Sequence, residues 1–243
     1  MEKIEFSLVI PCYNESKNIP HIIKRCKSLL KLRNFELILV NNGSSDNTNK
    51  VFKRYKSLKK LKFIKIKKNI GFGNGIMRGI QSSKGEIIGY THADRQTDPN
   101  DFYKCIKKIQ NNHYNKIFYK GYRINKLKNG WSWFDIFLTT SQSLFQSCML
   151  LCPMIDIHAQ PNIFSKNLIK NIKYFPKDFQ IDTFFYYLAK KKNFVIRRQK
   201  VNFNKKFRGY GEGNNDTYIK KIKGVLSHIF GTFNLIRIIF LKN

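Results

Sequence analysis

Short apolar runs of β type alternate with segments of helical periodicity through the first half of the chain, and each run ends in a polar turn. The expected strands are Phe6–Ile10, Phe35–Val40, Leu61–Ile66, Glu86–Thr91 and Lys116–Gly121, and the expected helices are Asn18–Leu30, Asp46–Tyr55 and Gly73–Ser82. Strands and helices that alternate in this way form βαβ units around a mainly parallel sheet. The pattern therefore predicts an α/β fold whose sheet is flanked by helices.

A chain of 243 residues is long enough for one such domain. We expect the domain to cover residues 1–215 and a helical extension to cover residues 216–243. Apolar residues recur in the extension at spacings of three and four: Ile222, Leu226, Ile229, Phe233, Ile236 and Phe240. Because lysines and an arginine surround them, the pattern predicts a basic amphipathic helix. Such a helix lies on a membrane surface or docks on the core of its own domain.

Three polar turns follow the first three expected strands, where the carboxyl ends of parallel strands collect ligands. In the first turn Pro11 ends the strand, Tyr13 can stack on a base or ribose, and Glu15 can accept hydrogen bonds from hydroxyl groups. The turn at residues 41–48 is glycine-containing and polar, and the turn at residues 69–75 lets the backbone approach a ligand at a helix N-terminus. Walker and GxGxxG spacings are absent from these turns. Together they predict a nucleotide site at one edge of the sheet.

A loop with metal-binding side chains follows the fourth expected strand. The sequence Gly85–Pro99 places His92, Asp94 and Gln96 at alternate positions directly after apolar residues. Oxygen ligands with open coordination positions suit Mg²⁺ or Mn²⁺ that bridges a substrate diphosphate, and imidazole suits Mn²⁺ better than Mg²⁺. The loop therefore predicts a divalent metal at the phosphates of a nucleotide.

The second half of the chain contains a segment without charge, Ile136–Ile155, in a protein with 25% charged residues. Seven hydroxyl or amide side chains and Pro153 argue against a membrane-spanning helix. We expect a helix that lines a groove or lies at an interface.

The composition is strongly basic, with 46 lysines and arginines against 15 acidic residues and a net charge of +31. The lysines are spread through nearly every segment, so we expect no specific nucleic acid partner and assign the charge to attraction toward anionic lipids or phosphorylated substrates. The five cysteines show neither a CxxC pair nor zinc spacing, and the first residues lead directly into a strand without a signal peptide. These features predict a cytoplasmic protein.

The motifs PCYNE, VNNGSSDNT, NIGFGNGIMRGI and HADRQTDP, taken together, resemble those of family 2 glycosyltransferases with the GT-A fold, a Rossmann-like α/β fold. The sequence is most similar to the polyprenyl-phosphate sugar synthases, the group of dolichol-phosphate mannose synthase, over about residues 5–125 and more loosely over 155–215. The resemblance implies a nucleotide-diphosphate sugar donor, Mg²⁺ or Mn²⁺, and a polyprenyl phosphate acceptor at the inner face of a membrane.

The resemblance also implies site residues. The nucleotide would contact Pro11, Tyr13, Glu15, Asn41, Ser44, Asn69, Gly71 and Ala93, and the metal would contact His92, Asp94 and Gln96. The residues implied for catalysis are Asp94, Arg123, Asp156, Asp182 and Arg208. The chain departs from the family pattern where Asn41 and Asn42 replace two aspartates and where His92 replaces the first aspartate of the metal loop.

The implied mechanism is metal-assisted transfer with inversion. The metal and Arg208 would neutralise the leaving nucleoside diphosphate, and Arg123 would position an acceptor phosphate, whose ionised oxygen needs no strong base. A sugar hydroxyl acceptor would instead require a carboxylate such as Asp156 or Asp182 to take its proton. Two alternatives stay open: a transferase that acts on a saccharide hydroxyl in surface polysaccharide synthesis, and a non-catalytic binding module that has lost three acidic positions.

Overall fold

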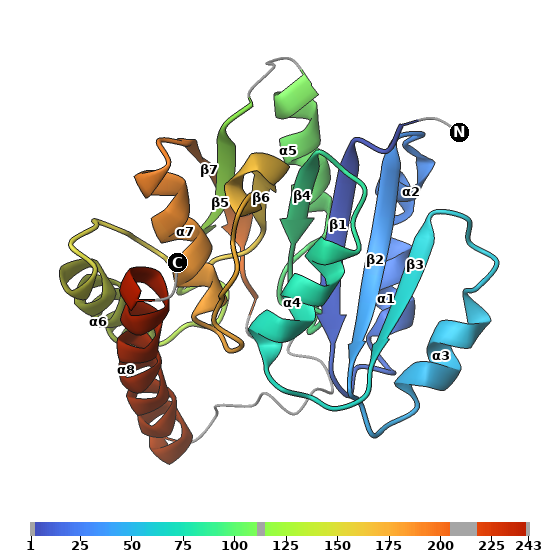
Figure 1. The fold of residues 1–243 in the computed structure, drawn as a ribbon. Coiled ribbons are helices and arrows are strands. Elements are labelled where there is room, and N and C mark those ends of the chain that lie inside the picture. Colours follow the sequence, from blue (N-terminus) through green and yellow to red (C-terminus); the bar gives the residue numbers. More distant parts are fainter. Residues whose placement is uncertain (1–2, 111–114, 205–217, 242–243) are drawn as a thin grey trace.

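One seven-stranded sheet, in the order β3-β2-β1-β4-β6-β5-β7, runs through the computed structural model (Figure 1), which describes residues 3–110, 115–204 and 218–241. The strands are β1 (Phe6–Cys12), β2 (Phe35–Asn42), β3 (Leu61–Ile66), β4 (Ile87–Tyr90), β5 (Ile117–Ile124), β6 (Asn162–Ser165) and β7 (Val195–Asn202). The helices are α1 (Ile19–Arg25), α2 (Lys27–Lys31), α3 (Thr48–Arg54), α4 (Phe72–Gln81), α5 (Asn100–Gln110), α6 (Trp133–Met149), the 3₁₀ helix η1 (Lys166–Ile169), α7 (Ile181–Lys191) and α8 (Tyr218–Leu241). The predicted α/β fold with a mainly parallel sheet and a C-terminal helix is confirmed.

Strand direction decides where loops meet. Strands β1, β2, β3 and β4 pair in parallel, as do β5 and β7, whereas β6 runs antiparallel to both β4 and β5. All strands except β6 therefore end at one edge of the sheet, and β6 begins there, with Asn162 opposite Tyr90. This edge carries the polar turns.

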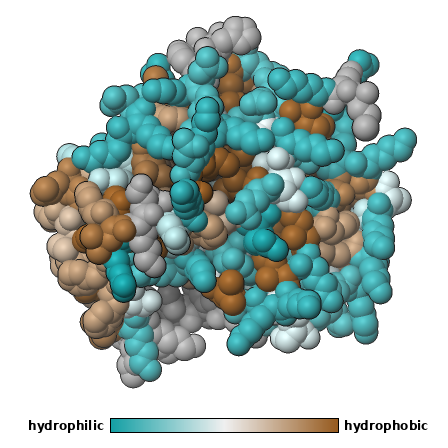
Figure 2. All heavy atoms as spheres, viewed as in Figure 1, coloured by the Kyte–Doolittle hydropathy of each residue, from teal (hydrophilic) through white to brown (hydrophobic). Residues whose placement is uncertain are grey.

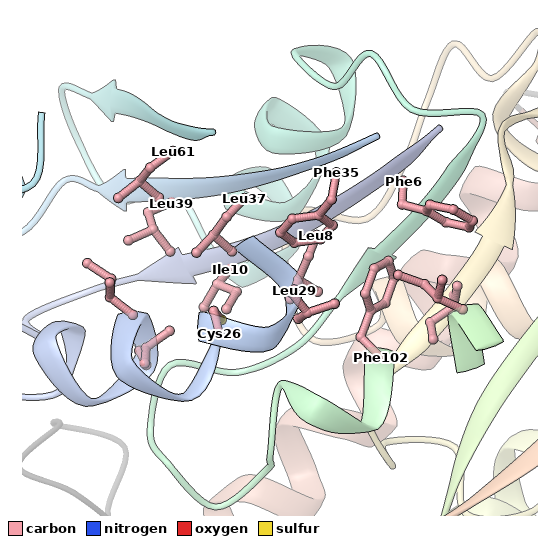
Figure 3. Close-up of a cluster of buried hydrophobic side chains, with 14 of the residues drawn as sticks. Phe6, Leu8, Ile10, Cys26, Leu29, Phe35, Leu37, Leu39, Leu61 and Phe102 are labelled. Atoms are coloured by element: carbon pink, nitrogen blue, oxygen red, sulfur yellow. The ribbon is translucent and has the colours of Figure 1, made fainter. Parts of the chain in front are cut away.

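Alternation along each strand sends apolar side chains to both faces of the sheet. Phe6, Leu8 and Ile10 of β1 pack with helices α1, α2, α3 and α5, and Figure 3 shows this cluster. Val9 faces the other side, where α4, α7 and α8 contribute to a second cluster. Both faces are thus buried, which explains why the central strands read as continuous apolar runs.

The structure differs from the predicted elements at several places, and helix α5 was not among the expected elements. The helix expected over Asn18–Leu30 is two helices, because the chain turns at Cys26. The helix expected over Ile136–Ile155 starts earlier and ends at Met149. Strands β6 and β7 were not among the expected elements: β6 has only four residues, two of them apolar, and β7 is an edge strand whose arginines and lysine face partly to solvent.

Helices α6 and α8 lie side by side at the end of the sheet opposite β3 (Figure 1). Helix α8 docks on the core mainly through Gly231, Thr232, Leu235 and Ile238, and of the predicted apolar stripe only the half-buried Ile236 packs against the core cluster. Most of that stripe is exposed, with Ile222, Leu226, Phe233 and Phe240 between 48% and 60% accessible. Helix α8 therefore carries apolar residues on its buried face and on its exposed face: docking on the core is observed for the first face, and membrane contact stays a prediction for the second.

Exposed apolar side chains also lie on α6 and in the turn after it: Trp133, Phe137, Leu144, Leu151 and Ile155. Figure 2 shows brown and tan atoms gathered over the α6 and α8 region at the left of the molecule, whereas teal atoms cover most of the rest of that view. We call these five residues together with Phe230 and Phe233 the apolar face. By length and composition alone, Ile222–Leu241 could cross a membrane, and 22% of it is buried within the protein.

Candidate active site

The loops at the carboxyl edge of the sheet enclose a cavity of about 700 Å³. Its described lining is Pro11, Cys12, Tyr13, Glu15, Asn42, Asn69, Gly71, Phe72, His92, Ala93, Asp94, Gln96, Arg123, Thr139, Gln142, His158, Phe179, Asp182, Phe203 and His228. The first twelve of these come from the ends of β1 to β4 and the segments that follow them, and the last comes from α8, so one cavity joins both halves of the chain.

Loops after β1 and β2 are tied to each other by hydrogen bonds. Ser45 N donates to Asn14 Oδ1 at 2.9 Å, and Asn14 N donates to Ser44 Oγ at 3.0 Å. Ser16 N donates to Asp46 Oδ2 at 3.1 Å, and Thr48 N donates to Asp46 Oδ1 at 2.9 Å. Asp46 thus accepts from the first N–H group of α3, whose N-cap residue is Asn47, and the loop that carries Tyr13 and Glu15 is held in place.

Asn41 and Asn42 have different surroundings. Asn41 builds the turn, since its Oδ1 accepts from Ser44 N at 2.8 Å and its Nδ2 donates to Asn49 at 2.7 Å. Asn42 lines the cavity and donates from Nδ2 to Gly71 O at 3.0 Å. Within the described residues the buried Oδ1 of Asn42 has no hydrogen-bond partner. Asn42, and not Asn41, is therefore the side chain that can accept a hydrogen bond from a ligand in the cavity.

Gly71 supplies a close contact at the start of α4. Its φ of +120° is unfavourable for L side chains, and a Cβ at this position would lie 2.1 Å from Lys177 O. Gly75 N donates to Gly71 O at 3.3 Å as the first bond of the helix, whereas Asn74 N donates outside the helix, to Lys177 O at 3.1 Å. A glycine here lets the 176–178 segment close one wall of the cavity.

The predicted metal loop lies on the cavity wall. Asp94 Oδ1 accepts a hydrogen bond from Gln96 N at 3.0 Å, and the His92 ring stacks on Phe72 with centroids 5.0 Å apart. Burial raises the pKa of Glu15 to about 7; its hydrogen bond with Asn18 lowers it, while the charge of Asp94 raises it further. Two carboxylates that repel each other across this wall make it a favourable place for a cation.

The residues present fit a divalent ion that is held mainly by its substrate. In the described part of the chain, no three His, Cys, Asp or Glu side chains are grouped to hold a metal. His92, Asp94 and Gln96 all line the cavity, and one carboxylate with neutral neighbours is the kind of set in which diphosphate oxygens complete the coordination. The imidazole favours Mn²⁺ over Mg²⁺.

Arg123 and Asp156 form a buried ion pair next to the cavity. Burial raises the pKa of the Asp156 carboxyl, but the charge and hydrogen bonds of Arg123 outweigh this and hold it below its usual range. The Arg123 guanidinium also lies 4.8 Å from the Trp131 ring and 5.8 Å from the Phe203 ring. Arg123 lines the cavity, whereas Asp156 lies behind it.

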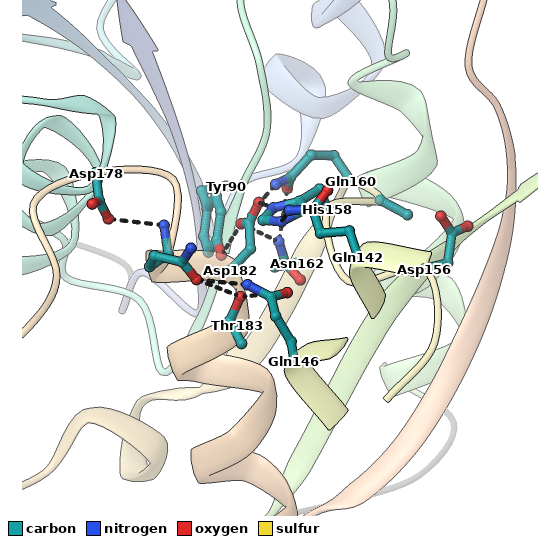
Figure 4. A network of polar contacts seen from close by, with 12 residues as sticks. Tyr90, Gln142, Gln146, Asp156, His158, Gln160, Asn162, Asp178, Asp182 and Thr183 are labelled. Atoms are coloured by element: carbon teal, nitrogen blue, oxygen red, sulfur yellow. Dashed lines mark hydrogen bonds and ion pairs between the residues drawn. The ribbon is translucent and has the colours of Figure 1, made fainter. Parts of the chain in front are cut away.

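Asp182 is the centre of a buried polar network (Figure 4). Its Oδ1 accepts from Tyr90 Oη at 2.7 Å, from Gln160 Nε2 at 2.9 Å and from Asn162 Nδ2 at 3.1 Å. Its Oδ2 lies 3.2 Å from His158 Nδ1. Burial alone would raise the pKa of Asp182, but the His158 hydrogen bond and the charge of Lys120 lower it to about 2. The contacts at both oxygens and the nearby Lys120 charge thus favour the ionised form of Asp182.

Most of the predicted site residues meet in the cavity. Those that line it are Pro11, Tyr13, Glu15, Asn69, Gly71, His92, Ala93, Asp94, Gln96, Arg123 and Asp182. Asn41, Ser44 and Asp156 are near it but do not line it, and Arg208 lies outside the described residues. Thr139 and Gln142 also line the cavity, which agrees with the expectation of a groove-lining helix.

Sequence reasoning missed His158 and His228. His158 stands two residues after Asp156, which the resemblance implied for catalysis, and that proximity was the available signal. His228 had none, because it lies in an apolar helix far from every other site residue in the sequence. Their rings are 4.8 Å apart at the cavity wall.

A model of one protein family matches most of the chain: the description is glycosyl transferase family 2, and the match covers residues 7–190. Curated relatives match over a shorter stretch. A dolichol-phosphate mannosyltransferase of Pyrococcus furiosus is 28% identical over 108 residues, which is 44% of this chain and 31% of that protein. An undecaprenyl-phosphate 4-deoxy-4-formamido-L-arabinose transferase of Proteus mirabilis is 34% identical over 112 residues, 43% of this chain and 34% of that protein. The chain thus spans about a third of the length of these relatives.

Solved structures share the fold over nearly the whole chain. A glucosyl-3-phosphoglycerate synthase of Mycobacterium tuberculosis, in complex with Mn²⁺, UDP and glucosyl-3-phosphoglycerate, has a TM-score of 0.67 at 13% identity and covers 94% of this chain and 79% of that chain. A mannosyltransferase of Pyrobaculum calidifontis, in complex with GDP-Man and Mn²⁺, has a TM-score of 0.66 at 14% identity and covers 96% of this chain and 65% of that one. At these identities the likeness concerns the fold.

Proposed function

Because the chain belongs to glycosyl transferase family 2, we propose that it moves one sugar, with inversion, from a nucleoside diphosphate sugar to a polyprenyl phosphate. The observation that carries the proposal is the cavity whose wall joins the strand-end loops to Arg123 and Asp182. A donor held by the loops and an acceptor held at the other end would meet inside it. The names of the curated relatives support a polyprenyl phosphate as the acceptor.

The loops after β1 to β4 would hold the donor. Tyr13 stacks on the nucleoside, Asn42 Oδ1 accepts a hydrogen bond from it, and Gly71 lets the backbone approach. His92, Asp94 and Gln96 would hold a divalent ion against the diphosphate, and that ion supplies charge neutralisation for the leaving group. Arg208 is retained as a second proposed cation for the leaving group, although it lies outside the described residues. Asn41 and Ser44 would act by shaping the turn.

Arg123 would orient the acceptor phosphate. Its guanidinium is held by Asp156 on one side and by the Trp131 ring on another, so it is oriented before a ligand arrives. A fixed guanidinium at the cavity wall is suited to bidentate recognition of phosphate oxygens.

The apolar face would lie against a membrane. Trp133, Phe137, Leu144 and Phe230 are each at least 64% exposed, and a chain of net charge +31 is attracted to anionic lipid. Helices α6 and α8 carry this face on one side and contribute Thr139, Gln142 and His228 to the cavity wall. A lipid acceptor could therefore reach Arg123 from a membrane at the cytoplasmic face. The division into residues 1–215 and 216–243 remains part of this proposal.

The deciding experiment measures donor consumption with a panel of nucleoside diphosphate sugars, with Mn²⁺, Mg²⁺ or EDTA, and with or without a polyprenyl phosphate. We expect one donor to be consumed only with metal, faster with the lipid, and with a sugar-lipid product of inverted configuration. If a saccharide accelerates donor consumption and the lipid does not, the acceptor is a saccharide hydroxyl and not a polyprenyl phosphate. Absence of donor binding would favour a non-catalytic module.

A further inference from the structure

We propose that His158 is the second cationic group of the acceptor site: it binds a proton when the acceptor phosphate arrives and donates a hydrogen bond to that phosphate from Nε2. The inference rests on the proposed function, because its ligand is the acceptor named there. The proton comes from the solvent and not from the acceptor, whose phosphate is already ionised. Arg123 balances one negative charge of the phosphate in this arrangement, and His158 balances the other.

The described wall of the cavity is short of positive charge. Among the described residues that line it, Arg123 is the only arginine or lysine, whereas Glu15, Asp94 and Asp182 carry carboxyl groups. The charge of Arg123 is already paired with Asp156. A phosphate monoester brings about two negative charges near neutral pH. A site built from Arg123 alone would therefore leave negative charge uncompensated at a largely buried wall.

His158 is placed to supply the missing charge. Its Nδ1 lies 3.2 Å from Asp182 Oδ2, and its Nε2 lies 3.0 Å from Gln142 Nε2 (Figure 4). The His158 side chain is 17% exposed and lines the cavity, so Nε2 is the ring nitrogen that a ligand can reach. The two residues of chain from Asp156 to His158 span at most about 7 Å. One short loop thus carries both the carboxylate that orients Arg123 and the imidazole.

The contacts of the ring without a ligand are those of a neutral imidazole. Nδ1–H donates to the Asp182 carboxylate, and the lone pair of Nε2 accepts from the Gln142 amide. A phosphate next to Nε2 would place the ring between two anions, and negative charge on both sides favours the imidazolium form. Nε2–H of His158 and an N–H of Gln142 would then both donate to phosphate oxygens.

The groups that face His158 in the described structure differ in their ability to gain a proton at pH 8. Asp182 on α7 is held as an anion, and burial lowers the pKa of His228 on α8 to about 3, so that ring stays neutral. Tyr90 on β4 keeps its proton, because burial raises its pKa. Burial lowers the pKa of Lys120 on β5 to about 7. Lys120 is thus the competing site of proton uptake that the test must separate from His158.

The test measures proton uptake by calorimetry. A short-chain, water-soluble prenyl phosphate is titrated into the wild type at pH 8 in HEPES and in Tris, two buffers with different heats of ionisation. The free ligand is dianionic at this pH, so a proton gained on binding comes from the buffer. We expect uptake of about one proton per bound phosphate. This measurement needs no substitution.

Two variants assign the proton. His158→Gln keeps a hydrogen-bond donor but cannot become charged, and the control His21→Gln changes an exposed histidine on α1. We expect His158→Gln to bind the prenyl phosphate about 10- to 100-fold more weakly and without proton uptake, because a neutral hydrogen bond replaces a charge-assisted one. Its nucleotide affinity with Mn²⁺ should be unchanged. His21→Gln should match the wild type in both measurements.

Inorganic phosphate carries the same ionised group without the prenyl chain. We expect it to bind more weakly than the prenyl phosphate and with the same proton uptake. Equal affinities would identify free phosphate as the ligand and would overturn the assignment of this site to the lipid acceptor.

Four further results would overturn the inference: no proton uptake by the wild type, undiminished uptake by His158→Gln, which would assign the proton to Lys120, a prenyl phosphate affinity of His158→Gln within threefold of the wild type, or an equal loss of its nucleotide affinity. Failure of the proposed function looks different. The wild type would then bind the prenyl phosphate with proton uptake but would not consume a nucleoside diphosphate sugar faster in its presence.

Discussion

Arg123 donates two hydrogen bonds to Asp156, from its backbone N–H to Oδ2 at 2.7 Å and from Nε to Oδ1 at 2.5 Å. The side chains are 6% and 4% exposed. The pair therefore links the end of β5 to the loop that precedes β6, and it holds a cation at the cavity wall without leaving a buried charge uncompensated.

Removing one partner of this pair should cost stability. We expect Asp156→Ala to lower the free energy of unfolding by about 3–5 kcal/mol, because the buried guanidinium loses its counter-charge. Urea unfolding followed by circular dichroism measures this. The control is Glu86→Gln, which breaks an exposed pair with Lys3 at 3.9 Å and should cost less than about 1 kcal/mol. A similar loss of unfolding free energy in Asp156→Ala and Glu86→Gln would contradict the claim that burial makes the Arg123–Asp156 pair important for stability.

Asp94 is expected to be essential for the donor. Asp94→Asn keeps an oxygen that can accept from Gln96 N, so the loop should retain its shape while the carboxylate charge is lost. Turnover should fall at least about 100-fold, and the effect of Mn²⁺ on nucleotide affinity in calorimetry should disappear. In the matched variant Asp98→Asn, the side chain still caps α5 through Asn100 N, and turnover should stay near that of the wild type. Mn²⁺-dependent nucleotide binding by Asp94→Asn would rule out the metal assignment.

The close contact at Gly71 predicts a local structural effect. Gly71→Ala combines a φ of +120° with a Cβ 2.1 Å from Lys177 O, so the 176–178 segment must shift. We expect a loss of about 1–3 kcal/mol of stability and weaker nucleotide binding. Gly224→Ala within α8 should instead be neutral or stabilising by up to about 1 kcal/mol. Thermal unfolding measures the stability of the two variants, and nucleotide titration measures their affinity. Unchanged nucleotide affinity in Gly71→Ala would contradict a role for this close contact in the nucleotide site.

Acid should destabilise the fold through His228. Burial, helped by the charge of His158, lowers the pKa of His228 from 6.5 to about 3. Between these values the unfolded chain binds a proton that the native protein does not. The contribution of neutral His228 is therefore complete above pH 6.5 and is lost as the pH falls, by at most about 1.4 kcal/mol per pH unit.

His228→Phe removes this titration and keeps a ring next to His158. Its free energy of unfolding should depend less on pH between 6.5 and 4 than that of the wild type, whereas His21→Gln should keep the wild-type dependence. Equal slopes for His228→Phe and the wild type would contradict the assignment.

Membrane contact through the apolar face can be measured by vesicle sedimentation. Phe137→Ser combined with Leu144→Ser removes two side chains that are each 64% exposed. Binding to anionic vesicles should fall at least about tenfold, because each buried apolar side chain contributes about 1.5–3 kcal/mol. Leu58→Ser, after α3 at the other end of the sheet, should bind like the wild type. Equal vesicle binding by the wild type, the double variant and Leu58→Ser would mean that charge, and not the apolar face, attracts the protein to the membrane.

Local sequence patterns determined the first half of the fold. Apolar runs such as Phe35–Val40, followed by polar turns and helical spacing, specify a parallel sheet because both faces of each strand must be buried. The ends of parallel strands lie at one edge, so the positions of Tyr13, Asn69 and Asp94 in the cavity followed from the order of elements. The C-terminal helix α8 was also predicted, from the spacing of its apolar residues.

Tertiary contacts decided what each polar group does. The sequence cannot distinguish Asn41 from Asn42, because only the turn geometry directs one amide into the loop and the other into the cavity. It suggested Asp156 and Asp182 as bases for a hydroxyl acceptor, whereas only the structure shows that Arg123 bonds to the first and that Tyr90 of β4 and Asn162 of β6 bond to the second. His158 and His228 meet across 70 residues of chain, and the buried face of α8 was set by packing on α6 and α7. Periodicity reports how apolar a face is, whereas the partner of a side chain depends on long-range packing.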